Sequence, residues 1–360
     1  MKRTRRFPMS WSICLAAMAA AHASAGPAED VSADEVMRSL RLLPTSRAPL
    51  GDDEHRRGLR ATERMLVDRL REMGYEPTLQ PIEWVSPVMR LGRTGSNDDG
   101  PRREDDQAGA PEFWNNIIVE IPGVELPGEV VLIGAHFDAV ARSPGADDNG
   151  SGTAALLESA RVLRGHPMRR TVRLVFFNLE EIGLIGSRHH AARHAAEPQD
   201  QNLVAMVSLE CIGFYCVEPG CQKTPVEPIK GVFEPSTTGD FLAAVTIAAH
   251  KDVNRRFARA FESASQGLRI EPFDFLPVPI PDILRSDHAP FLAQGVPAIM
   301  LTGTANFRNP HYHKPTDTVE TIDQDRLVRA VRGIVAATID LAEPSPTPAP
   351  TDQDRSETRR

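Results

Sequence analysis

The chain has 360 residues, of which 41% are hydrophobic and 25% are charged, and its formal net charge at pH 7 is −8. This is the composition of a globular protein, and it excludes a wholly disordered, collagenous or coiled-coil chain. A chain of this length can bury roughly 70–75% of its unfolded surface, enough for one large α/β domain or two small ones. The acidic balance argues against nucleic-acid partners, which would require a basic surface.

The first 25 residues have the pattern of a secretory signal peptide. A positive leader that contains Lys2 and three arginines precedes the apolar run Trp11–Ala21, and Ala23-Ser24-Ala25 supplies the small residues of a cleavage site. The apolar run is about half the ~20 residues that span a bilayer, so we expect export to the periplasm or the extracellular space without stable membrane insertion. Removal of Met1–Ala25 would delete four positive charges and no acidic ones, which changes the formal charge from −8 to −12.

Two other segments have compositions that do not favour a packed core. Leu91–Pro111 has almost no apolar residues, and Glu343–Arg360 is rich in proline and charge. We expect a disordered insertion near residues 91–111 and an extended, disordered tail over 343–360. The remaining chain, residues 26–342, is predicted to form a single folded domain.

Helices and strands alternate along that domain. Short apolar strands separated by helices predict an α/β fold, with a mixed, mostly parallel central sheet that helices cover on both faces. The predicted elements, in chain order, are helix Gly58–Met73, strand Tyr75–Trp84, strand Asn116–Ile121, strand Val130–His136, helix Asn149–Leu163, strand Val172–Asn178, helix Ser187–Ala196, strand Leu203–Leu209, helix Asp240–His250, helix Asn254–Ser263, strand Ala298–Thr302 and helix Gln324–Leu341.

Three cysteines remain after the leader: Cys211, Cys216 and Cys221. In an oxidising compartment Cys216 and Cys221 could close a short loop and leave Cys211 as a free thiol. A thiolate metal site is the competing interpretation, but the sequence has no Cys-x-x-Cys pair. We favour the disulfide.

Acidic and histidine side chains follow the predicted strands at the points where the strands end. His136-Phe137-Asp138 closes one strand and is followed by Asp147-Asp148-Asn149, Glu180-Glu181 comes after the next strand, and Glu210 follows a third. A further block, Asn309–Thr318, follows the last strand. The carboxyl ends of parallel strands line one crevice, so these groups can converge. Histidines and carboxylates without cysteine suit zinc or a similar divalent ion, and two ions would need a bridging carboxylate.

These blocks, in this order and at this spacing, resemble the co-catalytic dizinc aminopeptidases of metallopeptidase clan MH, family 28, over roughly residues 116–323. The resemblance implies a zinc exopeptidase domain with two zinc ions, and peptides as substrates. By that resemblance, His136 and Glu210 would bind one zinc, Glu181 and His313 would bind the other, and Asp148 would bridge them.

The same resemblance assigns the catalytic side chains. Glu180 takes the place of the general base, and Asp138 that of the acid that orients the ring of His136. Tyr312, beside His313, could donate a hydrogen bond to the developing oxyanion or could simply pack. Many members of the family have Asp at the position of Glu210, so metal preference and ion spacing stay open.

Each motif also has a simpler interpretation. Asp147-Asp148-Asn149 alone would be a turn and helix cap, Glu180-Glu181 a solvated pair, and His136 with Asp138 a local salt bridge. Together at the family's spacing, they favour a metal site. The remaining histidines are interpreted separately: His189, His190 and His194 are predicted to be solvated, His311 is a second candidate for the ligand position of His313, and His288 with Asp287 matches a block in relatives whose role stays open.

The sequence therefore predicts an exported zinc aminopeptidase that releases N-terminal residues from peptides. A carboxypeptidase or dipeptidase on the same site is the first alternative. A glutaminyl-cyclase-like acyltransferase is less favoured, because that branch resembles a one-zinc site. A non-catalytic binding protein is least favoured, because the ligand set and Glu180 are intact.

Overall fold

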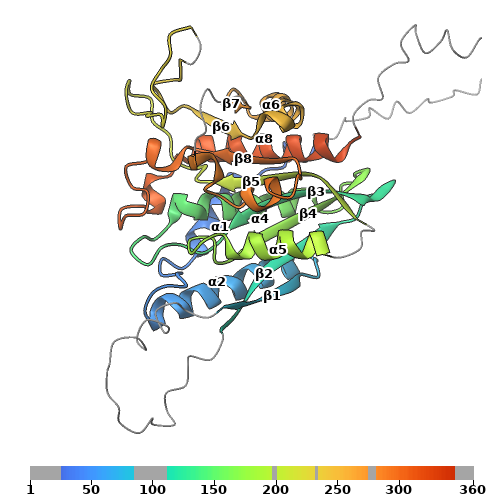
Figure 1. Ribbon diagram of the computed structural model, residues 1–360. Coiled ribbons are helices and arrows are strands. Elements are labelled where there is room, and N and C mark those ends of the chain that lie inside the picture. Colours follow the sequence, from blue (N-terminus) through green and yellow to red (C-terminus); the bar gives the residue numbers. More distant parts are fainter. Residues whose placement is uncertain (1–25, 85–111, 197–200, 232–233, 275–280, 345–360) are drawn as a thin grey trace, which may run out of the picture.

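The computed structural model describes residues 26–84, 112–196, 201–231, 234–274 and 281–344 (Figure 1). The predicted signal peptide, the predicted insertion over 91–111 and the tail from residue 345 onward lie outside the described residues. Among the described residues, no helix is both long and apolar enough to cross a membrane.

A single eight-stranded mixed sheet forms the centre of the molecule, with strand order β1-β2-β4-β3-β5-β8-β6-β7 (Figure 1). Strands β4, β3, β5 and β8 are parallel neighbours, whereas β1, β2 and β6 introduce antiparallel pairs. The strands are β1 Thr78–Trp84, β2 Glu112–Ile121, β3 Leu126–His136, β4 Arg170–Phe177, β5 Asn202–Glu210, β6 Phe241–Val245, β7 Arg269–Phe273 and β8 Ala298–Thr302. The predicted α/β fold with a mixed, mostly parallel sheet is confirmed.

Helices cover both faces of this sheet, because successive residues of the central strands point to opposite sides. In β3, Val131, Ile133 and Ala135 pack with the larger group of helices, and Val130 and Leu132 pack with α5 and α7. The helices are α1 Ala33–Leu42, α2 Asp53–Glu72, α4 Gly152–Leu163, α5 Ile185–Ala196, α6 Lys251–Ala264, α7 Ala289–Leu292 and α8 Gln324–Ala342.

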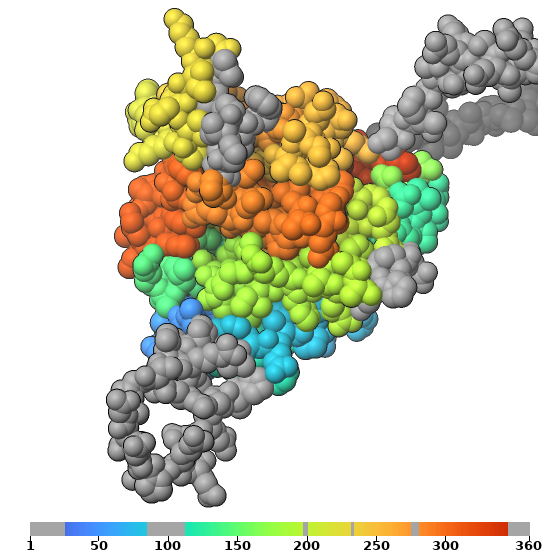
Figure 2. Space-filling view, in the orientation of Figure 1, coloured from blue at the N-terminus to red at the C-terminus, as the bar shows by residue number. Residues whose placement is uncertain are grey.

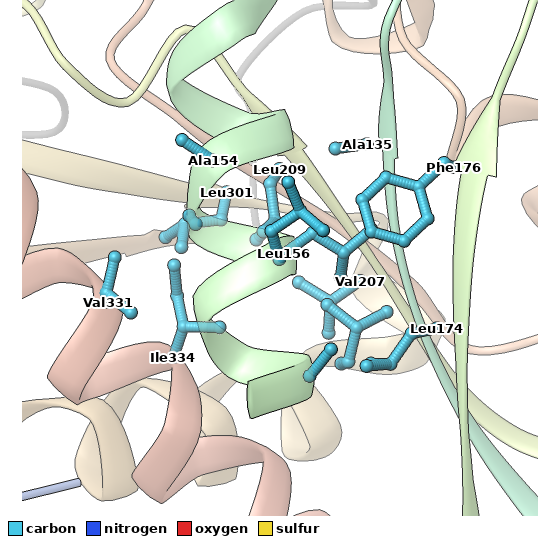
Figure 3. Close-up of a cluster of buried hydrophobic side chains, with 14 of the residues drawn as sticks. Ala135, Ala154, Leu156, Leu174, Phe176, Val207, Leu209, Leu301, Val331 and Ile334 are labelled. Carbon is cyan, nitrogen blue, oxygen red and sulfur yellow. The ribbon is translucent and has the colours of Figure 1, made fainter. Parts of the chain in front are cut away.

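The larger apolar cluster lies between the sheet and helices α1, α2, α4, α6 and α8. Figure 3 shows part of it, with Leu156 of α4 and Ile334 of α8 directed toward sheet residues that include Val207 and Phe176. All four side chains are fully buried. This dry core fixes the strands rigidly, and therefore also fixes the strand ends from which the polar loops begin.

One predicted element is wrong, and three of the listed elements, α1, β7 and the one-turn helix α7, were not predicted. Instead of a helix over Asp240–His250, the chain forms β6 and then a short 3-10 turn, Ala248–His250. The run Phe241–Val245 is buried on both faces between β7 and β8, and a short apolar run does not reveal whether it is strand or helix. Helix α1, which Ser32 caps at its N-terminus, and edge strand β7 were missed.

The predicted disulfide between Cys216 and Cys221 is confirmed, and Cys211 is a free, buried thiol. The disulfide closes a short loop in the long connection between β5 and β6. That connection pairs back on itself between Cys216 and Gly239.

The prediction that three histidines of α5 are solvated is wrong for His190, which is only 4% exposed. The His190 ring lies against Phe177 and Phe291, and its Nδ1 is 3.0 Å from Oε1 of Gln80. His189 and His194 are partly exposed. The weakly amphipathic sequence of α5 hides its buried face, which consists of Gly186, Ser187, His190 and Ala191.

Burial, reinforced by nearby Arg173, lowers the pKa of His190 from 6.5 to about 3. The unfolded chain therefore binds a proton near pH 6.5 that the folded chain does not bind until about pH 3. The free energy of unfolding should fall with decreasing pH across that interval, by up to about 1.4 kcal/mol per pH unit from this histidine. His190→Asn, whose amide can still donate to Gln80, should make this slope shallower in urea titrations between pH 7 and 5.

The same substitution at the partly exposed His250, His250→Asn, is the control and should keep the slope of the wild-type protein. Equal slopes for the wild-type protein and the His190 variant would contradict the assignment.

Candidate metal centre

The predicted site residues meet at the carboxyl edge of the central strands. His136 is the last residue of β3 and Glu210 the last of β5, while Glu180 and Glu181 lie three and four residues after the end of β4. Because β3, β4 and β5 are parallel, their ends lie at one edge. The loops after β3 and β8, which carry Asp148 and His313, reach the same edge, on the left in Figure 1.

One group of side chains surrounds the imidazole of His136, which is 1% exposed. Its Nε2 lies 3.4 Å from Oδ1 of Asp148, 3.6 Å from Oε2 of Glu210 and 3.8 Å from Oε2 of Glu180. A second group surrounds His313, whose Nε2 lies 2.9 Å from Oδ2 of Asp148 and 3.2 Å from Oε2 of Glu181. Asp148 belongs to both groups, and each of its two oxygens faces a different histidine.

The donor atoms have the chemistry and spacing that a metal ion requires. Within the described residues, Oδ2 of Asp148, Oε1 of Glu181 and Nε2 of His313 are buried, and apart from the ion-pair approaches of His313 given above none of them has a hydrogen-bond partner. Three sets of side chains place one donor atom each within 4.8 Å of the others: His136–Glu180–Glu210, Asp148–Glu181–His313 and Asp148–Glu210–Cys211. Buried charges of this kind are stable only when they are paired or coordinate a metal, and the set of nitrogen and oxygen donors fits zinc.

The electrostatics of the site show a deficit of positive charge. Burial and the neighbouring Asp148 raise the pKa of Glu181 to about 7. Burial also raises the pKa of Glu180 well above its ordinary value, against the attraction of His136. Burial alone would lower the pKa of His313, but Asp148 and Glu181 raise it to about 10. Carboxylates that resist ionisation beside histidines that retain protons form a site that would be stabilised by a divalent cation.

The two neighbouring aspartates have different roles. Asp147 is turned away from the site, where its carboxylate accepts hydrogen bonds from the backbone N–H groups of Gly213 and Phe214 and from Nδ2 of Asn309, at 2.7, 3.2 and 2.8 Å. Asp148 faces the histidines. The carboxylate of Asp317 holds the backbone of both, accepting from the N–H groups of Asp147 and Asp148 at 2.9 and 3.2 Å.

Asp138 contacts both His136 and the loop that carries the glutamate pair. Its Oδ1 lies 3.4 Å from Nδ1 of His136, and its backbone oxygen lies 3.2 Å from the same nitrogen. Its two carboxylate oxygens accept hydrogen bonds from the backbone N–H groups of Glu180 and Glu181, at 3.1 and 3.2 Å. One carboxylate therefore fixes the His136 ring relative to the glutamates.

Glu210 has partners that the sequence did not indicate. The hydroxyl of Ser286 donates to its Oε2 at 2.7 Å, and the thiol of Cys211 donates to its Oε1 at 3.1 Å. Ser286 in turn contacts the hydroxyl of Ser208 at 3.0 Å. Ser286 belongs to the block with Asp287 and His288 that the sequence matched to relatives, but its contact with Glu210 was not predicted, because it depends on the packing of the loop before α7.

Tyr312 stacks on His313, with ring centroids 3.9 Å apart. Its hydroxyl accepts a hydrogen bond from Nη2 of Arg285 at 3.2 Å, a contact that does not use the hydroxyl's own proton. His311 is directed elsewhere, with Nδ1 2.9 Å from the hydroxyl of Thr316.

Asp287 and His288 are fully buried, and neither belongs to the candidate ligand sets of the described residues.

An apolar cavity of about 140 Å³ adjoins the site and includes both Glu210 and Tyr312 in its wall. Strands β6, β7 and β8 supply Ala243, Phe273 and Met300 to the same wall. Figure 2 shows the segments on either side, around residues 215–240 (yellow) and 303–320 (orange-red), next to each other at the surface. Gln222 and Lys223 of the first segment hydrogen-bond to Thr304 and Phe307 of the second.

The model of Peptidase family M28 matches residues 116–338, and the chain belongs to that family. It is 32% identical to Escherichia coli (strain K12) YfbL over 231 residues, which cover 62% of this chain and 69% of YfbL. It is 27% identical to the aminopeptidase YwaD of Bacillus subtilis (strain 168) over 281 residues, 73% of this chain and 55% of YwaD.

Among solved structures, the fold is similar to BSAP, a zinc aminopeptidase from Bacillus subtilis, with a TM-score of 0.60 and 16% identity. The match covers 85% of this chain and 94% of that structure. The predicted membership of this peptidase family is confirmed, and the family implies a metal cofactor. The chain spans only about half the length of YwaD, so its own activity and substrates are addressed as proposals.

Proposed function

We propose that this chain is a zinc-dependent aminopeptidase that hydrolyses the N-terminal peptide bond of peptides at a dinuclear centre. The observation that carries the proposal is the position of Asp148, whose Oδ1 and Oδ2 face His136 and His313 at 3.4 and 2.9 Å. A carboxylate placed between two separate groups of ligands is what two ions require as a bridge. The aminopeptidase YwaD among its relatives supports the choice of the amino end.

Five side chains would hold the ions. His136 and Glu210 would bind one ion, Glu181 and His313 the other, and Asp148 both. When bound, zinc lowers the pKa of a water ligand from about 15.7 toward 7 and polarises the scissile carbonyl. The protein would supply the rest of the chemistry through residues around these ligands.

Glu180 is the proposed general base. Its Oε2 lies 3.8 Å from Nε2 of His136, so it can accept a proton from a water held between the ligands and pass it to the departing amine. Asp138 fixes the orientation of the His136 ring and the backbone of Glu180. The hydroxyl of Tyr312 would donate a hydrogen bond to the carbonyl oxygen as negative charge develops there.

We further propose that the enzyme acts outside the cytoplasm, in the periplasm or the extracellular space. The first 25 residues have the composition of a signal peptide. The disulfide between Cys216 and Cys221 supports the same conclusion, because such bonds persist in oxidising compartments.

The first prediction is metal dependence. Incubation with a chelator should abolish hydrolysis of aminoacyl anilides, and added zinc should restore it, because the nucleophilic water depends on the ions. N-blocked dipeptides, assayed in parallel, test the alternative of a carboxypeptidase and should not be hydrolysed. Full activity in the metal-stripped protein would refute the proposed function.

The second prediction separates the roles of the glutamate pair. Glu180→Gln keeps the shape of the side chain but removes the proton acceptor, so turnover should fall by at least ~10²-fold while zinc content stays near two per chain. Glu181→Gln should instead weaken one metal site, because a neutral amide is a poorer ligand, and its activity should recover partly in excess zinc. Metal analysis and steady-state kinetics on both variants provide the measurement.

If the Glu180 variant loses zinc and the Glu181 variant keeps it, the two roles are reversed. If both variants retain full metal content and full activity, the proposed mechanism is wrong.

The third prediction concerns the side chain at the cleaved end. We propose that the apolar cavity beside Glu210 and Tyr312 receives it, so leucine should be preferred over glycine. Ala243→Leu should fill the cavity and Met300→Ala should enlarge it, which moves the preference in opposite directions. Since one methylene in such a cavity is worth about 10-fold or more in kcat/KM, the leucine-to-alanine ratio should fall about 10-fold in the first variant.

The ratio of kcat/KM for leucyl and alanyl anilides is the measurement, with melting temperature and zinc content as checks on folding. An unchanged ratio in both variants would place the specificity site elsewhere.

A further inference from the structure

Arg47 is a buried arginine in the segment that joins α1 to α2, outside the part of the chain that the family model matches. It is 2% exposed and is among the largest fully buried side chains of the described residues. A charged side chain is almost never buried to this extent unless its environment satisfies it. In Figure 1 this blue segment lies near the green loop that follows β3.

Among the residues that the structure describes, the guanidinium of Arg47 donates only to backbone oxygens. Its Nε donates to the oxygen of Phe137 at 2.9 Å, and its Nη2 donates to that of Gly145 at 2.5 Å. Its Nη1 donates to the oxygens of Pro44, at 3.1 Å, and of Pro144. One planar group thus binds its own segment and two different stretches of the loop after β3.

Those two stretches carry the proposed ligands of the metal centre. Phe137 stands between His136 and Asp138, and Gly145 lies three residues before Asp148. The backbone oxygen of Arg47 also accepts a hydrogen bond from the N–H of Ala139 at 3.0 Å. Arg47 therefore connects both sides of the loop between the proposed ligands of the centre.

The guanidinium of Arg47 and the backbone of Asp148 both lie close to Gly145. Its φ of +67° is in the left-handed region, and a Cβ there would lie 2.8 Å from Nη2 of Arg47 and 2.4 Å from the backbone oxygen of Asp148. Glycine lets the guanidinium approach the backbone just before Asp148. A larger residue would have to push Arg47 and the loop apart.

The charge of Arg47 also acts on the site. Burial lowers the pKa of Arg47, while the carboxylates of Asp317, Asp148, Asp138 and Glu181 act in the opposite direction. Arg47 is thus a buried cation whose charge interacts favourably with these four carboxylates. In a desolvated region such a charge partly offsets their mutual repulsion.

We propose that Arg47 is a positioning residue of the metal centre. It holds the His136–Asp138 and Gly145–Asp148 stretches at a fixed separation, so that His136 and Asp148 are oriented before an ion binds. This inference rests on the proposed dinuclear function. The planar fork of arginine is essential to it, since the three donors of a lysine ammonium share one nitrogen and cannot reach four backbone oxygens spread around a guanidinium.

The test measures zinc affinity, by competition with a chromophoric chelator, together with kcat and KM. Arg47→Lys keeps the charge but loses the fork, and its zinc affinity should fall by about 10–100-fold, as for other residues that orient ligands. In saturating zinc its KM should stay near the wild-type value. Arg47→Ala should bind zinc still more weakly, and millimolar methylguanidinium should restore part of that affinity.

Arg170 provides a matched control. It is also a largely buried arginine that donates to backbone oxygens, those of Leu341 and Glu343 at 3.1 and 2.9 Å, but it lies at the start of β4, away from the site. Arg170→Ala should leave zinc affinity unchanged and should not respond to methylguanidinium.

Wild-type zinc affinity in Arg47→Lys, or an equal loss of affinity in Arg170→Ala, would overturn the proposal. If Arg47→Ala does not fold, Arg47→Lys decides the matter. A wild-type protein that binds no zinc would refute the proposed function itself, which is a separate outcome.

Discussion

The site depends on a single electrostatic constraint: several carboxylates and two histidines are crowded into a desolvated edge of the sheet. Asp148 is at the centre of this arrangement, since its two oxygens face His136 and His313 separately. Burial and the negative charge of Asp148 raise the pKa of Glu181 to about 7, so the surroundings of this carboxyl oppose its ionisation. A pair of divalent cations would resolve this conflict, and the rest of the fold holds the ligands in place despite their repulsion.

Hydrogen bonds to backbone groups hold most of the ligand-bearing loops in place. The carboxylates of Asp147 and Asp317 accept hydrogen bonds from backbone N–H groups of two loops, those that follow β5 and β3. Asp138 ties the glutamate loop to the ring of His136, and Arg47 ties the loop after β3 to the N-terminal segment. The ligands come from strands that the apolar core fixes, and the loops between them are fixed by buried polar groups. Precision of this kind is what orientation of metal ligands requires.

The sequence predicted those parts of the molecule that local patterns determine. The β-branched runs before His136 and Glu210 gave correct strands, and the order of the motifs identified the family. The sequence did not predict features that depend on tertiary contacts. The run Phe241–Val245 is a strand because β7 and β8 flank it, although its composition also suits a helix. His190 is buried because of the way α5 packs, and Arg47 gains its importance only through contacts with residues ~90 or more positions away.

The most direct test of the account is anomalous diffraction at the zinc edge from crystals of the zinc-loaded protein. The account predicts two zinc peaks about 3.5–4 Å apart, one between His136 and Glu210 and the other between Glu181 and His313, with Asp148 in contact with both. A single peak, or peaks that do not contact Asp148, would contradict the central claim that this carboxylate bridges two ions.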